Sequence, residues 1–122
     1  MPKISTSNDT AVSLQSCTDA CLQCYRTCLG MATNMCLEEG GRHAGTAHIG
    51  LMLGCAEICR TAAHFMIMES RLHQKVCAVC ADVCEACAVS CQQMGDMEEC
   101  VEVCRHCADT CRRMALGIAV KL

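Results

Sequence analysis

The stretch Cys77–Cys91, with the sequence CAVCADVCEACAVSC, decides the fold of this 122-residue chain. Its five cysteines are separated by steps of 3, 4, 3 and 4 residues, at positions Cys77, Cys80, Cys84, Cys87 and Cys91. This alternation follows one face of an α-helix. The spacing therefore predicts a helix whose thiols form a single inward stripe.

The same alternation recurs in three other segments of the chain. One stripe precedes the central stretch, two cysteines lie between them, and a last stripe follows: Cys17, Cys21, Cys24, Cys28; Cys55, Cys59; Cys100, Cys104, Cys107, Cys111. Four stripes with short connections predict an all-α, antiparallel, up-down-up-down four-helix bundle with a cysteine-lined core.

The expected helices span residues 11–38, 47–68, 71–94 and 97–118, within one bundle domain covering residues 11–122. Residues 1–10 are polar and are expected to be irregular. Gly40 and Gly41 are predicted to end the first helix. Asp96 and Glu99 have the spacing of a capping box for the last helix.

Composition excludes several classes of protein. The formal charge is −3 and no basic run is present, which disfavours nucleic acid as a partner. No apolar stretch reaches about 18 residues without polar breaks, so no membrane span is expected. The first ten residues lack the apolar core of an export signal, which predicts a cytosolic protein. A reducing cytosol disfavours a disulfide framework, so the 16 cysteines are expected to be free thiols.

Free thiols in such number point to a soft metal ion. Thiolates and thioethers select Cu(I), Zn(II) or iron–sulfur clusters. Zinc requires a closed tetrahedron of ligands, and iron–sulfur clusters are wrapped by loops. Neither arrangement suits thiols along four straight helices. Cu(I) accepts two or three sulfur ligands, and seven C-x3-C pairs are available: 17/21, 24/28, 55/59, 80/84, 87/91, 100/104 and 107/111. Low coordination number predicts a capacity on the order of one Cu(I) per cysteine.

The predicted topology gathers methionine and histidine at one end of the bundle. A thioether binds Cu(I) more weakly than a thiolate does, which favours capture and transfer inward. We expect six residues to form this uptake port: Met31, Met35, His48, Met52, Met94 and Met97. Cys36 lies beside the end of the first stripe and completes the candidate metal ligands. The alternatives are gap-filling methionines and a solvated histidine at a helix start. The role of His73, near the opposite end, stays open.

The C-x3-C pairs on all four helices, His48 and Met52 at the start of the second helix, and the ladder 77–91 resemble the bacterial copper storage proteins. The resemblance covers roughly residues 11–118. It implies storage of many Cu(I) ions without catalysis, in a homo-oligomer that is commonly a homotetramer, here of the cytosolic type. The chain departs from the family pattern in its second helix, which has Ala62 and Met66 where further thiols could lie.

Two other functions compete with copper storage. A zinc or mixed-metal thiolate buffer would use the same sulfur atoms. A thiol redox enzyme would need an exposed cysteine of low pKa beside a base, and no cysteine is singled out in this way. Copper itself would arrive from a copper chaperone or a small-molecule thiol.

Overall fold

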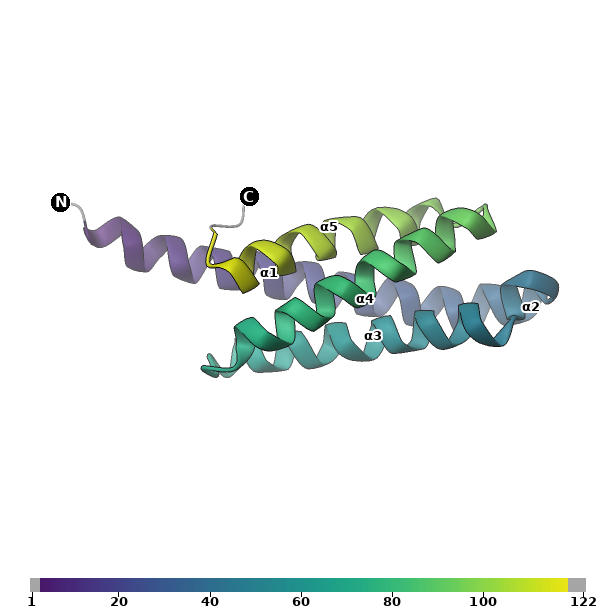
Figure 1. Ribbon diagram of the computed structural model, residues 1–122, viewed down its shortest axis with the longest axis horizontal. Coiled ribbons are helices and arrows are strands. Elements are labelled where there is room, and N and C mark those ends of the chain that lie inside the picture. Colours follow the sequence, from purple (N-terminus) through teal and green to yellow (C-terminus); the bar gives the residue numbers. More distant parts are fainter. Residues whose placement is uncertain (1–2, 119–122) are drawn as a thin grey trace.

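The computed structural model describes the backbone of residues 3–118 and the side chains of residues 13–118. Four long helices form the molecule: α1 (Lys3–Met31), α3 (Thr46–Ile67), α4 (His73–Met94) and α5 (Glu98–Leu116). Figure 1 shows them side by side as an elongated bundle, with α1 extending past the other three at one end. Each helix packs against its two neighbours in the order α1, α3, α4, α5 and back to α1. The predicted up-down-up-down four-helix bundle is confirmed.

Short segments connect the long helices. After α1 the chain makes a π-helical turn, η1 (Ala32–Cys36), then α2 (Leu37–Glu39) and a 3₁₀ turn, η2 (Gly41–Ala44). Gly40 and Gly41 have φ angles of 71° and 56°, in the left-handed region that favours glycine. The prediction that this glycine pair ends the first helical segment is therefore confirmed.

Two local predictions differ from the structure. α1 begins at Lys3, so the expected irregular segment is wrong for residues 3–10, while residues 1–2 lie outside the described residues. Once a packed helix exists, each further residue adds a hydrogen bond without a new nucleation cost. The capping box is also wrong: α5 begins at Glu98, no side chain caps it, and Asp96 adopts a left-handed φ of 58°.

The core consists of small and flexible side chains. Every one of the sixteen cysteines is buried, together with alanines between the stripes and the methionines Met52, Met66, Met97 and Met114. A buried free thiol behaves as a small hydrophobic group. Because these side chains are short, helices from opposite corners of the bundle approach closely enough for their sulfur atoms to touch.

Among the described residues, α4 is the one helix that is long and apolar enough to cross a membrane by length and composition alone. Its buried residues are the cysteines and alanines that face the bundle core. On the exposed side, Asp82 and Glu85 accept hydrogen bonds from Arg112 of α5, at 2.7 and 3.2 Å. The face of α4 that packs inside the bundle is thus apolar, while its exposed face carries both charged residues and apolar ones such as Val79 and Val89.

Candidate metal centre

Sulfur atoms form a continuous ladder along the axis of the bundle. At the end of the bundle that holds Cys17, the ladder joins Cys17 to Cys111 at 3.7 Å, Cys111 to Cys21 at 3.4 Å, and Cys21 to Cys107 at 3.6 Å. Cys107 then meets Cys59 at 3.7 Å. Each of these contacts joins two different helices, so the predicted stripes do meet at one shared axis.

Toward the opposite end of the bundle, the ladder continues with similar distances between sulfur atoms. Cys24 lies 3.8 Å from Cys104, and Cys28 lies 3.4 Å from Cys104 and 3.5 Å from Cys100. Cys100 in turn lies 3.2 Å from Cys91. Over this length, sulfur atoms from α1, α4 and α5 thus lie within contact distance of one another.

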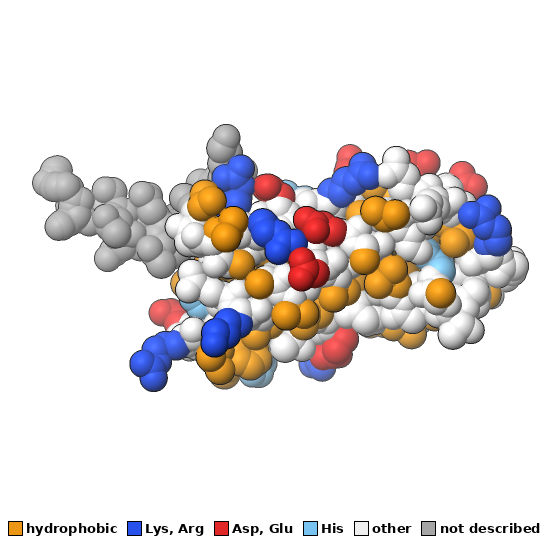
Figure 2. Space-filling view, viewed as in Figure 1, with side chains coloured by type: hydrophobic (Ala, Val, Ile, Leu, Met, Phe, Trp, Pro, Cys, Tyr) orange, Lys and Arg blue, Asp and Glu red, His pale blue; other side chains and the backbone are white. Residues whose placement is uncertain are grey.

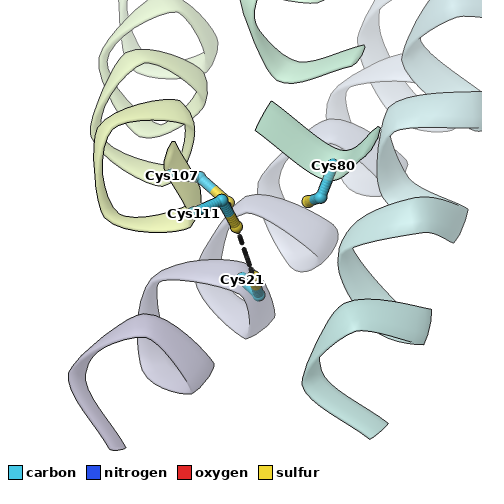
Figure 3. A group of neighbouring side chains, drawn as sticks. All are labelled: Cys21, Cys80, Cys107 and Cys111. Atoms are coloured by element: carbon cyan, nitrogen blue, oxygen red, sulfur yellow. Dashed lines mark hydrogen bonds between the residues drawn. The ribbon is translucent and has the colours of Figure 1, made fainter. Parts of the chain in front are cut away.

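Several sets of four thiols converge on common points. Figure 3 shows one of them, in which Cys21 of α1, Cys80 of α4, and Cys107 and Cys111 of α5 point toward one another. The four sulfur atoms lie within 4.8 Å of each other, and all four residues are buried. The sets overlap, since one contains Cys24, Cys55, Cys59 and Cys84 and another contains Cys59, Cys80, Cys84 and Cys107. One thiol can therefore serve two neighbouring sites.

These separations suit metal–thiolate coordination. Four thiolates around an ion at about 2.3 Å stand about 3.8 Å apart. The sulfur contacts along the ladder range from 3.2 Å between Cys91 and Cys100 to 4.0 Å between Cys87 and Cys91. Metal ions can thus enter with small adjustments of side chains and without separating the helices.

Near the Cys36 end of the ladder, the surroundings of two thiols favour their protonated form while metal is absent. Burial, followed by the nearby charges of Cys100 and Glu39, raises the pKa of the Cys36 thiol. Contact with Cys100, then with Cys87, and burial raise the pKa of the Cys91 thiol. A crowded, water-poor core cannot hold many uncompensated thiolates. Each thiol that binds a metal ion must therefore give up a proton to solvent.

A second kind of donor set lies at one end of the ladder. The Sγ atom of Cys36 is 3.7 Å from Nε2 of His48, 3.8 Å from Sδ of Met52 and 3.8 Å from Sδ of Met97. These four residues, which we call the terminal cluster, are all buried. They come from the π-helical turn, from α3 and from the residue before α5. The topology-based prediction that His48, Met52 and Met97 meet at one end is confirmed.

Cys36 lies inside the core, although its spacing placed it beside the stripe. The N–H of Leu37 donates to the carbonyl of Ala32, five residues back instead of four. Such a wide turn delays the rotation of the helix by about one residue. Thr33 contributes locally, because its hydroxyl donates to the carbonyl of Leu29 at 2.8 Å, a contact that tends to bend helices. Cys36 consequently takes the inward position that α-helical spacing assigned to Met35.

The remaining candidate residues lie around this end or away from it. Met31, Met35 and Met94 are half-buried and pack against the core, outside the terminal cluster. A hollow of about 390 Å³ at the α4–α5 connection is lined by residues that include Cys91 and Met97. At the opposite end, Nδ1 of His73 donates to the carbonyl of Ser70 at 2.8 Å, and Met66 is buried.

One partner of the terminal cluster was not predicted from the sequence. The hydroxyl of Ser90, on α4, lies 2.8 Å from Nδ1 of His48. Burial, followed by the neighbouring His43, lowers the pKa of His48 and favours a neutral ring. His43 meets the His48 ring edge-on at a centroid distance of 6.3 Å. The sequence indicates this contact only weakly, through the position of Ser90 directly before Cys91, the last cysteine of its stripe.

Comparison with known proteins agrees with the geometry. The family model described as Csp, copper storage protein, matches residues 10–116. The chain is 39% identical over 77 residues to the uncharacterized cysteine-rich protein YhjQ of Bacillus subtilis (strain 168). The aligned segment covers 63% of this chain and 70% of that protein.

Solved structures show the same relationship. The crystal structure of the Nmul_A1745 protein from Nitrosospira multiformis superimposes with a TM-score of 0.86 at 57% identity, covering 87% of this chain and 97% of that one. The Cu(I)-bound copper storage protein BsCsp3 gives a TM-score of 0.77 at 36% identity over 84% of this chain and 98% of that one. The apo form of copper storage protein 3 from Bacillus subtilis gives 0.75 at 34% identity, covering 83% and 97%.

The match therefore extends over nearly the whole bundle, including all four cysteine stripes. It confirms the resemblance drawn from the repeated C-x3-C pairs. The chain belongs to the copper storage protein family.

Proposed function

We propose that this protein stores many Cu(I) ions along the core of its bundle, bound by cysteine thiolates. The observation that carries the proposal is the continuous ladder of buried sulfur atoms, in which neighbours from different helices are 3.2–4.0 Å apart. Its structural relative BsCsp3 has been solved in a Cu(I)-bound form. All sixteen thiols are buried, and the function we propose for them is binding and release of copper, without turnover.

The overlap of the four-thiol sets favours Cu(I) over Zn(II). Zinc in structural sites takes four ligands of its own. Cys59 and Cys84 belong to two sets each, so those two sets cannot both be closed zinc cages with unshared ligands. Cu(I) needs fewer ligands and accepts bridging thiolates. Its single charge also balances one thiolate, which keeps a filled core near neutrality.

The terminal cluster and its surroundings form the uptake port in this proposal. Cys36 supplies one thiolate, His48 an imidazole, and Met52 and Met97 two neutral thioethers. Weaker donors at the end of a ladder of stronger ones create a gradient of Cu(I) affinity, and copper moves inward to the sites that bind it more tightly. Met31, Met35 and Met94 line the approach as outer donors.

We place this storage in the cytosol, where the reducing environment maintains free thiols. The copper donor is a copper chaperone or a small-molecule thiol. We also propose a homotetramer, supported by exposed apolar side chains such as Leu53, Val79 and Val89 on α3 and α4. Figure 2 shows hydrophobic side chains gathered between charged groups on the face over these two helices.

Anaerobic titration tests the storage proposal. Reduced protein is titrated with Cu(I) or with Zn(II) in competition with a chromophoric chelator, and bound metal is counted by native mass spectrometry. Copper should saturate at several times the zinc value, since zinc uses about four thiols per ion. Equal capacities for both ions would favour the zinc or mixed-metal buffer.

A further inference from the structure

The imidazole of His48 is held between two polar contacts made by two other elements. Nδ1 lies 2.8 Å from the hydroxyl of Ser90 on α4, and Nε2 lies 3.7 Å from Sγ of Cys36 in η1. The residue is 4% exposed. Water therefore cannot readily replace either contact.

The two contacts select one arrangement of protons on the ring. A neutral imidazole carries a single proton, and the nitrogen that binds a metal must be the bare one. If Nδ1–H donates to the Ser90 hydroxyl, Nε2 presents its lone pair toward Cys36. The S–H of Cys36 can then donate to Nε2 across their 3.7 Å contact. In this arrangement the thiol hydrogen meets Nε2 and the Nδ1 hydrogen meets the hydroxyl oxygen.

The opposite tautomer fits the site less well. Nε2–H would then point at a sulfur atom, which is a weak acceptor. It would also aim a proton at the sulfur atom of Cys36, beside which a metal ion would lie. The ring has its other neighbour in His43, which meets it edge-on and supplies no hydrogen bond to Nδ1. The contact with Cys36 therefore disfavours Nε2–H, and Ser90 supplies the oxygen that accepts from Nδ1–H in the favoured form.

We infer that Ser90 is a positioning residue for the terminal cluster: its hydroxyl holds His48 in the Nδ1–H tautomer, with Nε2 aimed at the metal position beside Cys36. This inference rests on the proposed function of the cluster as the copper port. Partners of this kind, one contact removed from the metal, orient metal-binding histidines, and their loss costs about 10–100-fold in metal affinity. Sequence spacing alone would class Ser90 as a polar residue at the edge of a stripe.

Nitrogen NMR of the full-length protein labelled with ¹⁵N-histidine tests the inference. The His48 resonances are assigned with a His48→Gln variant, and the tautomer is determined in reduced, metal-free protein. Cu(I) is then added at buffered free concentrations, and the shift of Nε2 reports the occupancy of this one site. Cu(I) is diamagnetic, so the signals remain observable. The variants are Ser90→Ala and Ser90→Thr, with Ser16→Ala on α1 as a matched control.

Wild-type His48 should be in the Nδ1–H form. The Ser90→Ala variant should lose this preference and bind Cu(I) at His48 about tenfold more weakly, while Ser90→Thr and Ser16→Ala should resemble the wild type. An unchanged tautomer or unchanged affinity in Ser90→Ala would overturn the inference. Equal losses in the alanine and threonine variants would assign the effect to packing and overturn it as well.

Failure of the port itself would look different. A wild-type Nε2 resonance that ignores Cu(I) would show that His48 is no ligand, whatever tautomer Ser90 selects. That result would remove the proposed port and, with it, the reason for positioning the ring.

Discussion

Replacing Cys59 with alanine removes a sulfur atom at the point where three helices meet. Its Sγ lies 3.5 Å from Cys84, 3.7 Å from Cys80 and 3.7 Å from Cys107. The residue is fully buried and belongs to two overlapping four-thiol sets. The substitution therefore affects both packing and ligand supply, and the two effects can be measured separately.

The expected magnitudes follow from what is removed. In metal-free protein, the loss of one buried sulfur compares with the deletion of a buried methyl or methylene group, about 1 kcal/mol. For a domain of this size, that lowers Tm by roughly 3–6 °C. In the copper-binding protein, two sets drop from four thiols to three. Because Cu(I) needs only two or three sulfur ligands, capacity should fall by on the order of one to two ions.

Thermal unfolding followed by circular dichroism measures the first effect, and anaerobic Cu(I) titration with native mass spectrometry measures the second. Leu116→Ala on α5 is the control, since it truncates an exposed side chain and removes no sulfur. It should change stability by less than about 0.5 kcal/mol and leave capacity unchanged. A Cys59→Ala protein that is less stable but still binds the wild-type number of ions would refute the reasoning, because Cys59 would then be a packing residue only.

Further perturbations test other parts of the account. Replacing Met31 and Met35 together with leucine should slow Cu(I) uptake several-fold in stopped-flow mixing and leave capacity within about one ion; a proportional fall in capacity would contradict the port. Copper at about 1,000 times its dissociation constant should stabilise the bundle by about 4 kcal/mol, and calorimetry that shows no rise in Tm would contradict binding to the folded core. Because burial raises the pKa of Cys36 and contact with Cys100 raises that of Cys91, the folded metal-free chain keeps protons that the unfolded chain loses above about pH 8.5. Its unfolding free energy should therefore stay level below that pH and fall above it, so urea denaturation that shows greater stability at pH 10 than at pH 7.5 would be inconsistent. Arg112→Ala should cost less than about 1 kcal/mol, since its ion pairs are exposed; a larger loss in the same assay would mean that this network matters more than exposed pairs usually do.

The bundle and most of its core could be predicted from spacing because the cysteines mark one face of each helix. Cys77–Cys91 shows this most clearly, since five thiols at alternating steps permit only one inward face. The position of each residue along the bundle axis followed from the predicted topology, which placed His48, Met52 and Met97 at the same end. These predictions needed only helical periodicity and short connections.

Cys36 and Ser90 show where such reasoning ends. Cys36 turns inward because the hydrogen-bond register changes from four to five residues in η1, and residue spacing does not encode that change. Ser90 reaches His48 because of how α3 and α4 are rotated against each other, which depends on the packing of the whole core. The helical backbone of residues 3–10 was missed for a related reason, since polar composition describes side chains and not the continuation of an existing helix.

The most direct measurement is a crystal structure of the protein loaded anaerobically with Cu(I), with anomalous scattering recorded on both sides of the copper absorption edge. The account predicts a row of copper peaks along the bundle axis, each within bonding distance of thiolates from the ladder, and one further peak beside Cys36 and His48. Copper confined to the outer surface, or a core of disulfides with no copper peaks in fully reduced starting material, would contradict it.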